Sequence, residues 1–198
     1  MKYAYLHGFA SSSKSTKGQK LARMFAGGDV DLMLPDLNNP SFEEVTYSGM
    51  VEAMETFDQE RGAEEPWRII GSSMGGYVAT RWAQLHPGRV DRLLLLCPGF
   101  NMSERWAEIL GEKGIDDWRE EGSFLFFSPT GELTAVHWEL YRDARDEHPA
   151  YPKVDCPVHI MHGADDEIVP LESSRHYVEL VDDAELEVLE IGRASCRE

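Results

Sequence analysis

The chain is poor in basic residues and in long apolar runs, and each shortage excludes a class of protein. Lysine and arginine total 19 against 36 acidic residues, so the formal net charge is −17 at pH 7. Such a field repels nucleic acid backbones and anionic lipid surfaces, so we expect neither as a partner. No segment approaches the roughly 18 consecutive apolar residues that span a bilayer, and the N-terminus has no secretory signal pattern. We therefore expect a cytoplasmic protein.

Cysteine is also scarce. The three cysteines, Cys97, Cys156 and Cys196, have no CxxC spacing, and their odd number leaves any disulfide scheme incomplete. Cys97 closes a run of leucines, which is typical of a buried thiol rather than a ligand or a nucleophile. Nothing in the sequence resembles a metal site, so we expect neither a metal nor a cofactor.

What the sequence does contain is a regular alternation of strand and helix patterns over 198 residues, enough for one domain with a substantial core. Predicted strands cover residues 3–6, 31–34, 67–70, 92–97, 158–161 and 186–190. Predicted helices cover residues 16–25, 42–61, 75–86 and 171–180. This alternation predicts an α/β fold with a mostly parallel, doubly wound sheet and helices on both faces. The loops that follow the strands then share one edge, where ligands usually bind.

One segment interrupts the alternation. About sixty residues separate the strand ending at Cys97 from the strand at Val158, too many for a simple crossover. We interpret residues 99–152 as a lid insert with two helices, at 103–110 and 133–146. The insert is rich in aromatic residues: Trp106, Trp118, Phe124, Phe126, Phe127, Trp138 and Tyr141. Most should pack the core of the insert itself, and one or two could line an acyl pocket.

The sequence Gly71-Ser72-Ser73-Met74-Gly75-Gly76 follows a predicted strand and opens a predicted helix, as a nucleophile elbow requires. Small residues allow the tight turn, which would expose the hydroxyl of Ser73 at the sheet edge. The N-terminus of the following helix supplies free N–H groups and a partial positive charge for a developing oxyanion. We predict that Ser73 is a nucleophile; the alternative is a serine–glycine turn without chemistry.

His7-Gly8-Phe9 directly follows the first strand and resembles the oxyanion loop of α/β-hydrolases. In that family, the backbone N–H after the His-Gly pair joins the N–H after the nucleophile. The resemblance therefore implies that Phe9 and Met74 form the oxyanion hole. Backbone donors suit this role because they are fixed before the reaction. We interpret His7 as a residue that braces the loop rather than as the catalytic base.

The segment from His162 to Pro170, HGADDEIVP, is similar to the loop that carries the triad acid in the same family. Asp166 matches the acid by spacing, with Asp165 as the neighbouring alternative. The acid would orient an imidazole and stabilise its protonated form. The order of serine before acid also agrees with the order of the triad in this fold.

Together these motifs identify the chain as a member of the α/β-hydrolase superfamily, similar to its short serine esterase and thioesterase branch. Residues 1–190 would form a single domain with its lid. The resemblance implies a serine hydrolase that cleaves a small-molecule carboxylic ester or thioester through an acyl-enzyme. The sequence leaves the natural substrate and the oligomeric state open.

The family places its catalytic histidine after the last strand, where this chain has no histidine. Residues 191–198, IGRASCRE, can be encoded by the start of a common short-read sequencing adapter. We therefore hypothesise that this tail is not native and replaces a segment that carries the histidine. Without a base the serine is a weak nucleophile, so we expect the chain as given to be nearly inactive. The replaced segment would also hold a final helix that packs on the sheet; its loss would expose apolar surface, so we expect the chain to be prone to aggregate. If the tail is genuine, a non-catalytic binding module becomes the favoured alternative; a peptidase or acyltransferase with the same nucleophile is another.

Overall fold

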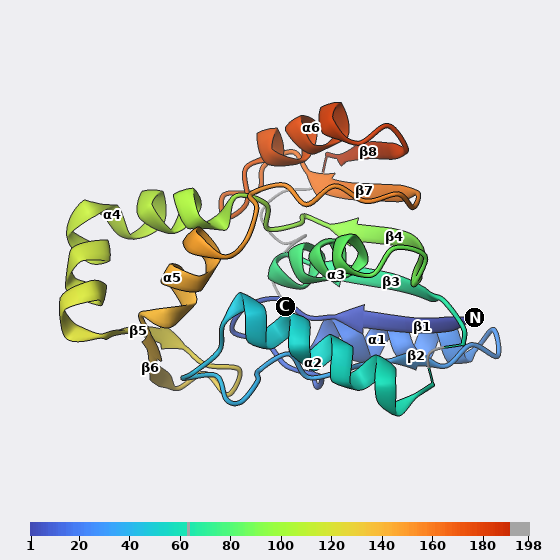
Figure 1. The fold of residues 1–198 in the computed structure, drawn as a ribbon, viewed down its shortest axis with the longest axis horizontal. Coiled ribbons are helices and arrows are strands. Elements are labelled where there is room, and N and C mark those ends of the chain that lie inside the picture. The colour runs from blue at the N-terminus through green and yellow to red at the C-terminus, as the bar shows by residue number, and fades with distance from the viewer. Residues whose placement is uncertain (63, 191–198) are drawn as a thin grey trace.

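The computed structural model describes residues 1–62 and 64–190. The predicted tail at 191–198 lies outside the described residues. The elements follow in the order β1 (Lys2–Leu6), α1 (Thr16–Ala26), β2 (Leu32–Met33), α2 (Tyr47–Glu60), β3 (Trp67–Ser72), α3 (Met74–Leu85), β4 (Val90–Leu96), α4 (Met102–Glu121), β5 (Ser123–Phe127), β6 (Leu133–His137), α5 (Glu139–Asp146), β7 (Val158–Gly163), α6 (Leu171–Leu180) and β8 (Ala184–Leu189) (Figure 1).

The main sheet has six parallel strands in the order β2-β1-β3-β4-β7-β8, which confirms the predicted α/β fold. From β1 the chain first moves outward to β2, then returns to β3 on the other side of β1. This reversal lies between β1 and β3, and ligands bind outside the carboxyl ends of strands at such a point. The loops after β1 and β3 therefore lie side by side where a site is expected.

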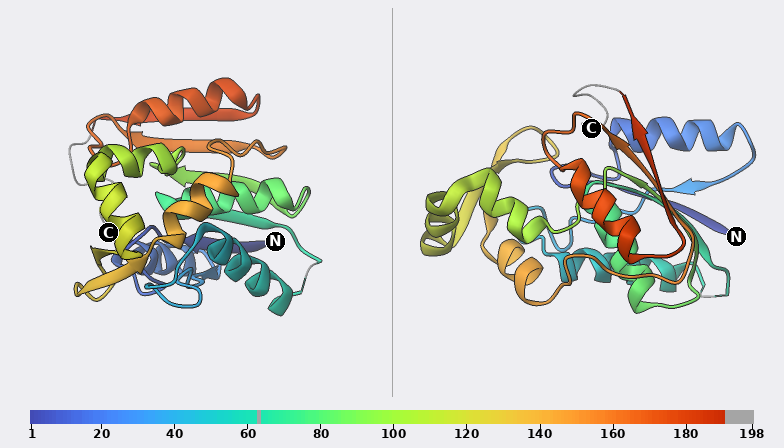
Figure 2. Two further views of the ribbon diagram at one scale, coloured as in Figure 1. Left: turned by 60° about the vertical axis from the view of Figure 1, so that its left-hand side comes forward. Right: turned by 90° about the horizontal axis from the view of Figure 1, so that it is seen from above.

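Helices cover both faces of the sheet. α2, α3 and α6 pack on one face, and α1 lies on the other (Figure 2, right). The core beneath the three helices includes Trp67, Trp82 and Ile160, each fully buried, whereas Tyr5 and Ile70 belong to a smaller cluster against α1. Within the two described stretches, no helix combines the length and the apolar character that crossing a bilayer requires.

α2 begins later than predicted. The sequence pattern suggested a helix from residue 42, but the first helical residue is Tyr47. Thr46 caps this end because its Oγ1 accepts a hydrogen bond from Gly49 N at 2.9 Å, satisfying an N–H that has no partner inside the helix. Phe42 instead lies in the preceding loop with its side chain buried.

The lid lies beyond the carboxyl ends of the strands and contains α4, a β5–β6 hairpin and α5 (Figure 1). The predicted helix over 133–146 is therefore wrong in its first half. Leu133–His137 is a strand paired antiparallel with Ser123–Phe127. The two strands alternate buried and exposed side chains, as a hairpin with one covered face must. Val136 is fully buried, and Leu133, on the opposite face of the same strand, is 60% exposed.

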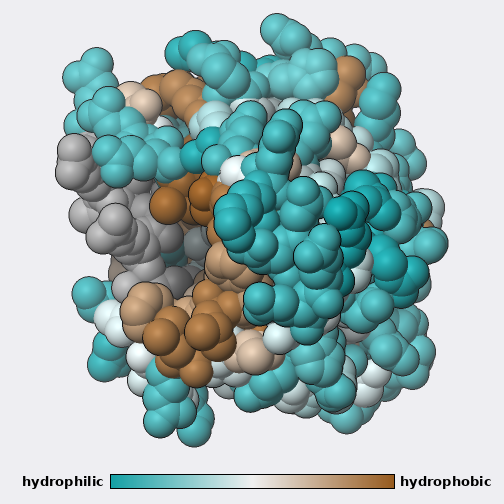
Figure 3. Space-filling view, turned by 90° about the vertical axis from the view of Figure 1, so that its left-hand side faces the viewer, coloured by the Kyte–Doolittle hydropathy of each residue, from teal (hydrophilic) through white to brown (hydrophobic). Residues whose placement is uncertain are grey.

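Trp118 forms the centre of the lid. Its side chain is fully buried and its Nε1 donates a hydrogen bond of 2.9 Å to the carbonyl of Val136. Its ring contacts five other aromatic rings of the lid: Trp106, Phe124, Phe126, Trp138 and Tyr141. Most aromatics of the insert thus pack its own core, as the sequence predicts. Figure 3 looks onto the face that carries the lid and shows hydrophobic side chains around a hollow.

Candidate active site

Ser73 stands at the tight turn between β3 and α3. Its backbone has φ 50° and ψ −120°, a strained conformation of the kind that concentrates at functional sites. A Cβ on Gly71 would lie 2.6 Å from the carbonyl oxygen of Gly75, and a Cβ on Gly75 would lie 2.3 Å from that of Leu6. Only glycine fits at these two positions, so the turn holds Ser73 at the sheet edge. The Ser73 hydroxyl does not cap the helix it precedes.

The loop after β1 passes directly beside this turn. A Cβ on Gly8 would lie 3.3 Å from Cβ of Ser73, so the backbone that leads to Phe9 runs against Ser73. Ala10 has φ 57°, a left-handed conformation that is uncommon for alanine. The first N–H groups of α3, including that of Met74, have no acceptor within their own helix. The fold therefore brings Phe9 and Met74 to the same serine, although their oxyanion role remains a prediction.

His7 holds this loop in place. Its side chain is 3% exposed, and its Nε2 accepts a hydrogen bond of 2.9 Å from Leu37 N. Nε2 is therefore unprotonated, and Nδ1 carries the proton that it donates to the carbonyl of Gly8 at 2.9 Å. Both ring nitrogens are committed to backbone groups, so His7 braces the loop, as predicted.

Asp166 follows β7 on a loop at the same edge of the sheet. Its Oδ1 accepts hydrogen bonds of 2.9 Å from the backbone N–H groups of Ile168 and Val169, which fixes the carboxylate. Its Oδ2 is buried and has no hydrogen-bond partner among residues 1–62 and 64–190. A buried carboxylate oxygen without a partner is costly, and it is available to accept a hydrogen bond from the N–H of an imidazole. Asp165, the alternative acid, is solvent-exposed.

His162 at the end of β7 is fully buried and serves the fold. Its Nε2 donates to the carbonyl of Val169 at 2.9 Å, so Nδ1 accepts from the Ser174 hydroxyl at 2.8 Å. Burial lowers the pKa of His162 and favours this neutral form. Its ring thereby joins β7, α6 and the loop that carries Asp166.

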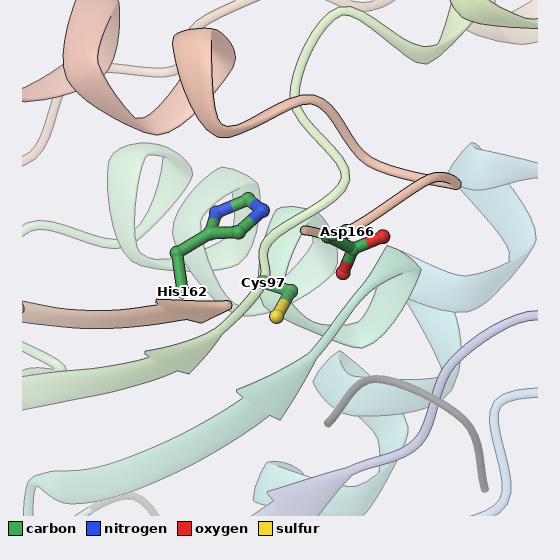
Figure 4. A group of neighbouring side chains, drawn as sticks. All are labelled: Cys97, His162 and Asp166. Atoms are coloured by element: carbon green, nitrogen blue, oxygen red, sulfur yellow. The ribbon is translucent and has the colours of Figure 1, made fainter. Parts of the chain in front are cut away.

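Cys97, His162 and Asp166 place one possible metal-ligand atom each within 4.8 Å of one another (Figure 4). They come from the end of β4, the end of β7 and the loop after β7. The imidazole has no lone pair to offer a metal, because Nε2 is protonated and Nδ1 accepts the Ser174 proton. This set of donors therefore does not fit a metal centre.

A cavity of about 420 Å³ opens beside Ser73. Its walls come from the two loops, the elbow and the lid: Gly8, Phe9, Ala10, Ser72, Ser73, Met74, Met102, Trp106, Ile109, Phe126 and Ile168. Trp106 and Phe126 are the two lid aromatics that reach this cavity; Trp118, Phe124, Trp138 and Tyr141 pack within the lid, and Phe127 is exposed. Apart from the serines, the lining side chains are apolar, so the cavity suits an acyl chain or an aromatic group.

The sequence analysis missed two side chains that hold the site. Arg105 on α4 donates hydrogen bonds to the carbonyl oxygens of Glu167 at 2.7 Å and Ile168 at 2.8 Å, next to Asp166. Lys17 on α1 donates at 3.0 Å to the hydroxyl of Ser72, the residue before Ser73. Both contacts join segments more than 50 residues apart, and no local pattern in the sequence marks them.

The fold is that of an α/β-hydrolase. It combines the parallel sheet with a tight turn after β3 and with the loops after β1 and β7, the second of which carries Asp166. The family model "Uncharacterised protein family (UPF0227)" matches residues 2–190. The chain therefore belongs to this family.

The chain is also similar to one curated relative and to several solved structures. The chain is 26% identical over 152 residues to the pimeloyl-[acyl-carrier protein] methyl ester esterase of Chromobacterium violaceum, and the match covers 61% of this chain and 60% of that protein. A structure described as a hydrolase from Agrobacterium vitis S4 superposes with a TM-score of 0.81 at 26% identity, over 97% of this chain and 80% of that one.

More distant structures share the fold alone. Mouse alpha/beta hydrolase domain-containing protein 10 has a TM-score of 0.77 at 18% identity, over 97% of this chain and 81% of that one. Est1E from Butyrivibrio proteoclasticus, solved with ferulic acid bound, has a TM-score of 0.74 at 19% identity, over 94% and 78% of the two chains.

Proposed function

We propose that the intact protein is a serine hydrolase that cleaves a carboxylic ester or thioester, with Ser73 as nucleophile and Asp166 as triad acid. The observation that carries the proposal is Oδ2 of Asp166, which is buried and has no hydrogen-bond partner among the described residues, on a fixed loop at the edge where Ser73 stands. The curated relative is named as an esterase of a methyl ester, which favours ester chemistry over the alternatives.

In this proposal, Ser73 Oγ attacks the carbonyl carbon of the substrate and gives its proton to a histidine base. The N–H groups of Phe9 and Met74 stabilise the oxyanion of the tetrahedral intermediate. Collapse of the intermediate breaks the bond to the leaving alcohol or thiol, which takes the proton from the base. Water then attacks the acyl-enzyme in the same way and releases the acid.

The base is the unassigned member of this triad. His7 and His162 already use both ring nitrogens in hydrogen bonds to other groups. We propose that the base belongs to a native segment after Glu190, which residues 191–198 replace in the chain as given. Resequencing the 3′ end of the source gene tests this point directly. Codons for a histidine shortly after Glu190 would support it, and a confirmed tail followed by a stop codon would contradict it.

Covalent labelling tests the nucleophile independently of turnover. A fluorophosphonate probe should modify the wild-type chain at Ser73, slowly if the base is missing, and should not modify a Ser73→Ala variant. Ser103→Ala, on the lid, is the matched control and should label at the wild-type rate. Modification of another serine, detected by peptide mass spectrometry, would refute the assignment of Ser73.

Two other functions stay open. A non-catalytic binding module would bind small molecules without Ser73-dependent turnover, and it gains weight if the tail is genuine. A peptidase or an acyltransferase would form the same acyl-enzyme but differ in leaving group or acceptor. Competition between water and added alcohols or amines in an acyl-enzyme assay separates these functions from a hydrolase.

A further inference from the structure

A second, larger depression adjoins the apolar cavity. It has a volume of about 820 Å³ and lies between the loop after β1 and the turn of the β5–β6 hairpin. Hydroxyl groups come from both sides of this groove: Ser11, Ser12 and Thr16 from the loop, and Ser128, Thr130 and Thr134 from the hairpin. The apolar cavity and this polar groove thus differ sharply in chemistry.

Ala10 lines both depressions, and the ring of Phe9 contacts an aromatic side chain of each. Phe9 contacts Phe42, which lines the groove, with 5.1 Å between ring centroids, and Phe126, which lines the cavity, with 5.2 Å. A ligand that occupies both depressions must therefore pass Ala10. This residue follows Phe9, whose backbone N–H is the proposed oxyanion donor. Ser73 lines the cavity that Ala10 also borders, but not the groove, so the ester bond of such a ligand would lie on the cavity side of Ala10.

The groove wall is held in shape by its own hydrogen bonds. Nδ2 of Asn38 donates to the carbonyl of Ser11 at 2.9 Å and to Oδ1 of Asp36 at 2.8 Å. The second carboxylate oxygen of Asp36 accepts from Ser13 Oγ at 3.3 Å. This preorganisation lowers the entropic cost of binding a polar ligand.

The charges at the groove select against anions. Asp36, Glu43 and Glu132 line it together with a single lysine, Lys14, and the whole chain carries a net charge of −17. A phosphate or carboxylate on the ligand would be repelled by this field. Neutral hydroxyl groups can instead exchange donors and acceptors with the serine and threonine hydroxyls.

We propose that the groove binds the neutral, polyhydroxylated alcohol portion of the substrate, such as a sugar or another polyol, while the acyl portion lies in the apolar cavity. This inference rests on the proposed ester hydrolysis at Ser73 and names its substrate class. The groove has about twice the volume of the cavity, so a methyl ester would leave most of the site unused. The alcohol would leave first, through the groove, before water attacks the acyl-enzyme.

Binding of non-hydrolysable probes tests the proposal without requiring turnover. Isothermal titration should give a Kd for hexyl β-glucoside that is at least about tenfold lower than that for 1-hexanol, because the sugar adds several hydrogen bonds in a preorganised site. Hexyl phosphate, which has the same alkyl chain and an anionic head, should bind no more tightly than 1-hexanol. Equal Kd values for the glucoside and 1-hexanol, or a preference for the phosphate, would overturn the proposal.

A pair of variants on the hairpin localises the effect. Thr130→Trp, at the exposed turn, fills the groove and should abolish the preference for the glucoside over 1-hexanol. Leu125→Trp, on the outer face of the same hairpin and 58% exposed in the wild type, should leave that preference unchanged. A preference that survives Thr130→Trp would place the sugar elsewhere. Binding of 1-hexanol to both variants reports that the lid is folded.

The proposed function and this inference can fail separately. If fluorophosphonate does not label Ser73 but the glucoside preference holds, the groove binds polyols in a protein that is not a serine hydrolase. If Ser73 is labelled and the preference is absent, the hydrolase stands and this substrate class is wrong.

Discussion

The guanidinium of Arg105, on the lid helix α4, donates a hydrogen bond of 2.8 Å to the carbonyl oxygen of Ile168, two residues after Asp166. A second bond, of 2.7 Å, reaches the carbonyl of Glu167. The backbone N–H of the same Ile168 donates to Oδ1 of Asp166. The lid therefore fixes the loop whose backbone orients the proposed catalytic acid.

Arg105→Ala should loosen this loop. We expect the amide hydrogens of Ile168 and Val169 to exchange at least about tenfold faster, because each lost tenfold of protection corresponds to about 1.4 kcal/mol, the net value of one or two hydrogen bonds. Hydrogen exchange followed by mass spectrometry measures this effect. Arg119→Ala, which removes an exposed arginine from the same helix, is the control and should leave exchange in the acid loop unchanged. If the amides of Ile168 and Val169 are equally protected in both variants, Arg105 does not position this loop.

Asp166→Asn should nearly abolish activity in a chain that carries the proposed histidine base. The amide oxygen can keep the two backbone bonds of Oδ1, but the amide nitrogen cannot accept a hydrogen bond from an imidazole N–H. We expect kcat to fall by about 10⁴-fold, which is the loss caused by the same aspartate-to-asparagine change in the triad of a serine protease. Asp165→Asn should stay within about twofold of the wild type because its side chain is exposed. The opposite pattern in ester hydrolysis assays would make Asp165 the acid.

The buried imidazole of His162 predicts a pH dependence of stability. Its folded-state pKa is lowered by burial, so the unfolded state binds the proton more readily. The stabilisation is therefore fully present above the unfolded pKa of about 6.5 and is lost as the pH falls toward the lower folded pKa. We expect the free energy of unfolding, measured with urea, to decrease below pH 6.5. His162→Gln should be less stable at pH 8 and should lack this part of the decrease.

Asp58 forms a buried charged cluster at the opposite edge of the sheet from Ser73. It is 4% exposed and accepts hydrogen bonds from Lys2 at 2.9 Å, from Trp67 Nε1 at 2.6 Å and from Arg89 at 2.6 Å. Burial opposes the charged carboxylate, but the bonds from Arg89, Trp67 and Lys2 outweigh it and lower the pKa of Asp58. Its stabilising contribution is thus present above the unfolded pKa of about 3.9 and is lost as the pH falls through the folded value.

Asp58→Asn should destabilise the protein by about 3–5 kcal/mol, since it removes the carboxylate that faces the buried ammonium of Lys2 and the partly buried guanidinium of Arg89. It should also reduce the loss of stability below pH 4. Urea unfolding at pH 7 and at pH 3 measures both effects. The control is Asp116→Asn, because Asp116 is 55% exposed in its pair with Arg119; such pairs contribute about 0–1 kcal/mol. Similar losses in the two variants would contradict the role of burial.

The sequence alone determined the parallel sheet and the three loops at its carboxyl edge. Alternating or uniformly apolar runs indicate strands that cross a core. Glycine indicates tight turns in which a larger side chain would clash with the backbone. For this reason the sequence could name Ser73 and Asp166 as candidate site residues and His7 as a residue that braces its loop. Each of the three lies within a few residues of a strand end.

Only the tertiary structure decided what surrounds these residues. The segment 133–137 has an ambiguous short pattern, and it became a strand because β5 pairs with it and Trp118 covers it. The contacts of Arg105 with Ile168 and of Lys17 with Ser72 span 63 and 55 residues, distances over which hydrophobic periodicity carries no information. The same holds for the polar groove, whose two walls come from the first loop and from the lid. Such features depend on how elements pack together, and packing is a property of the whole chain rather than of any segment.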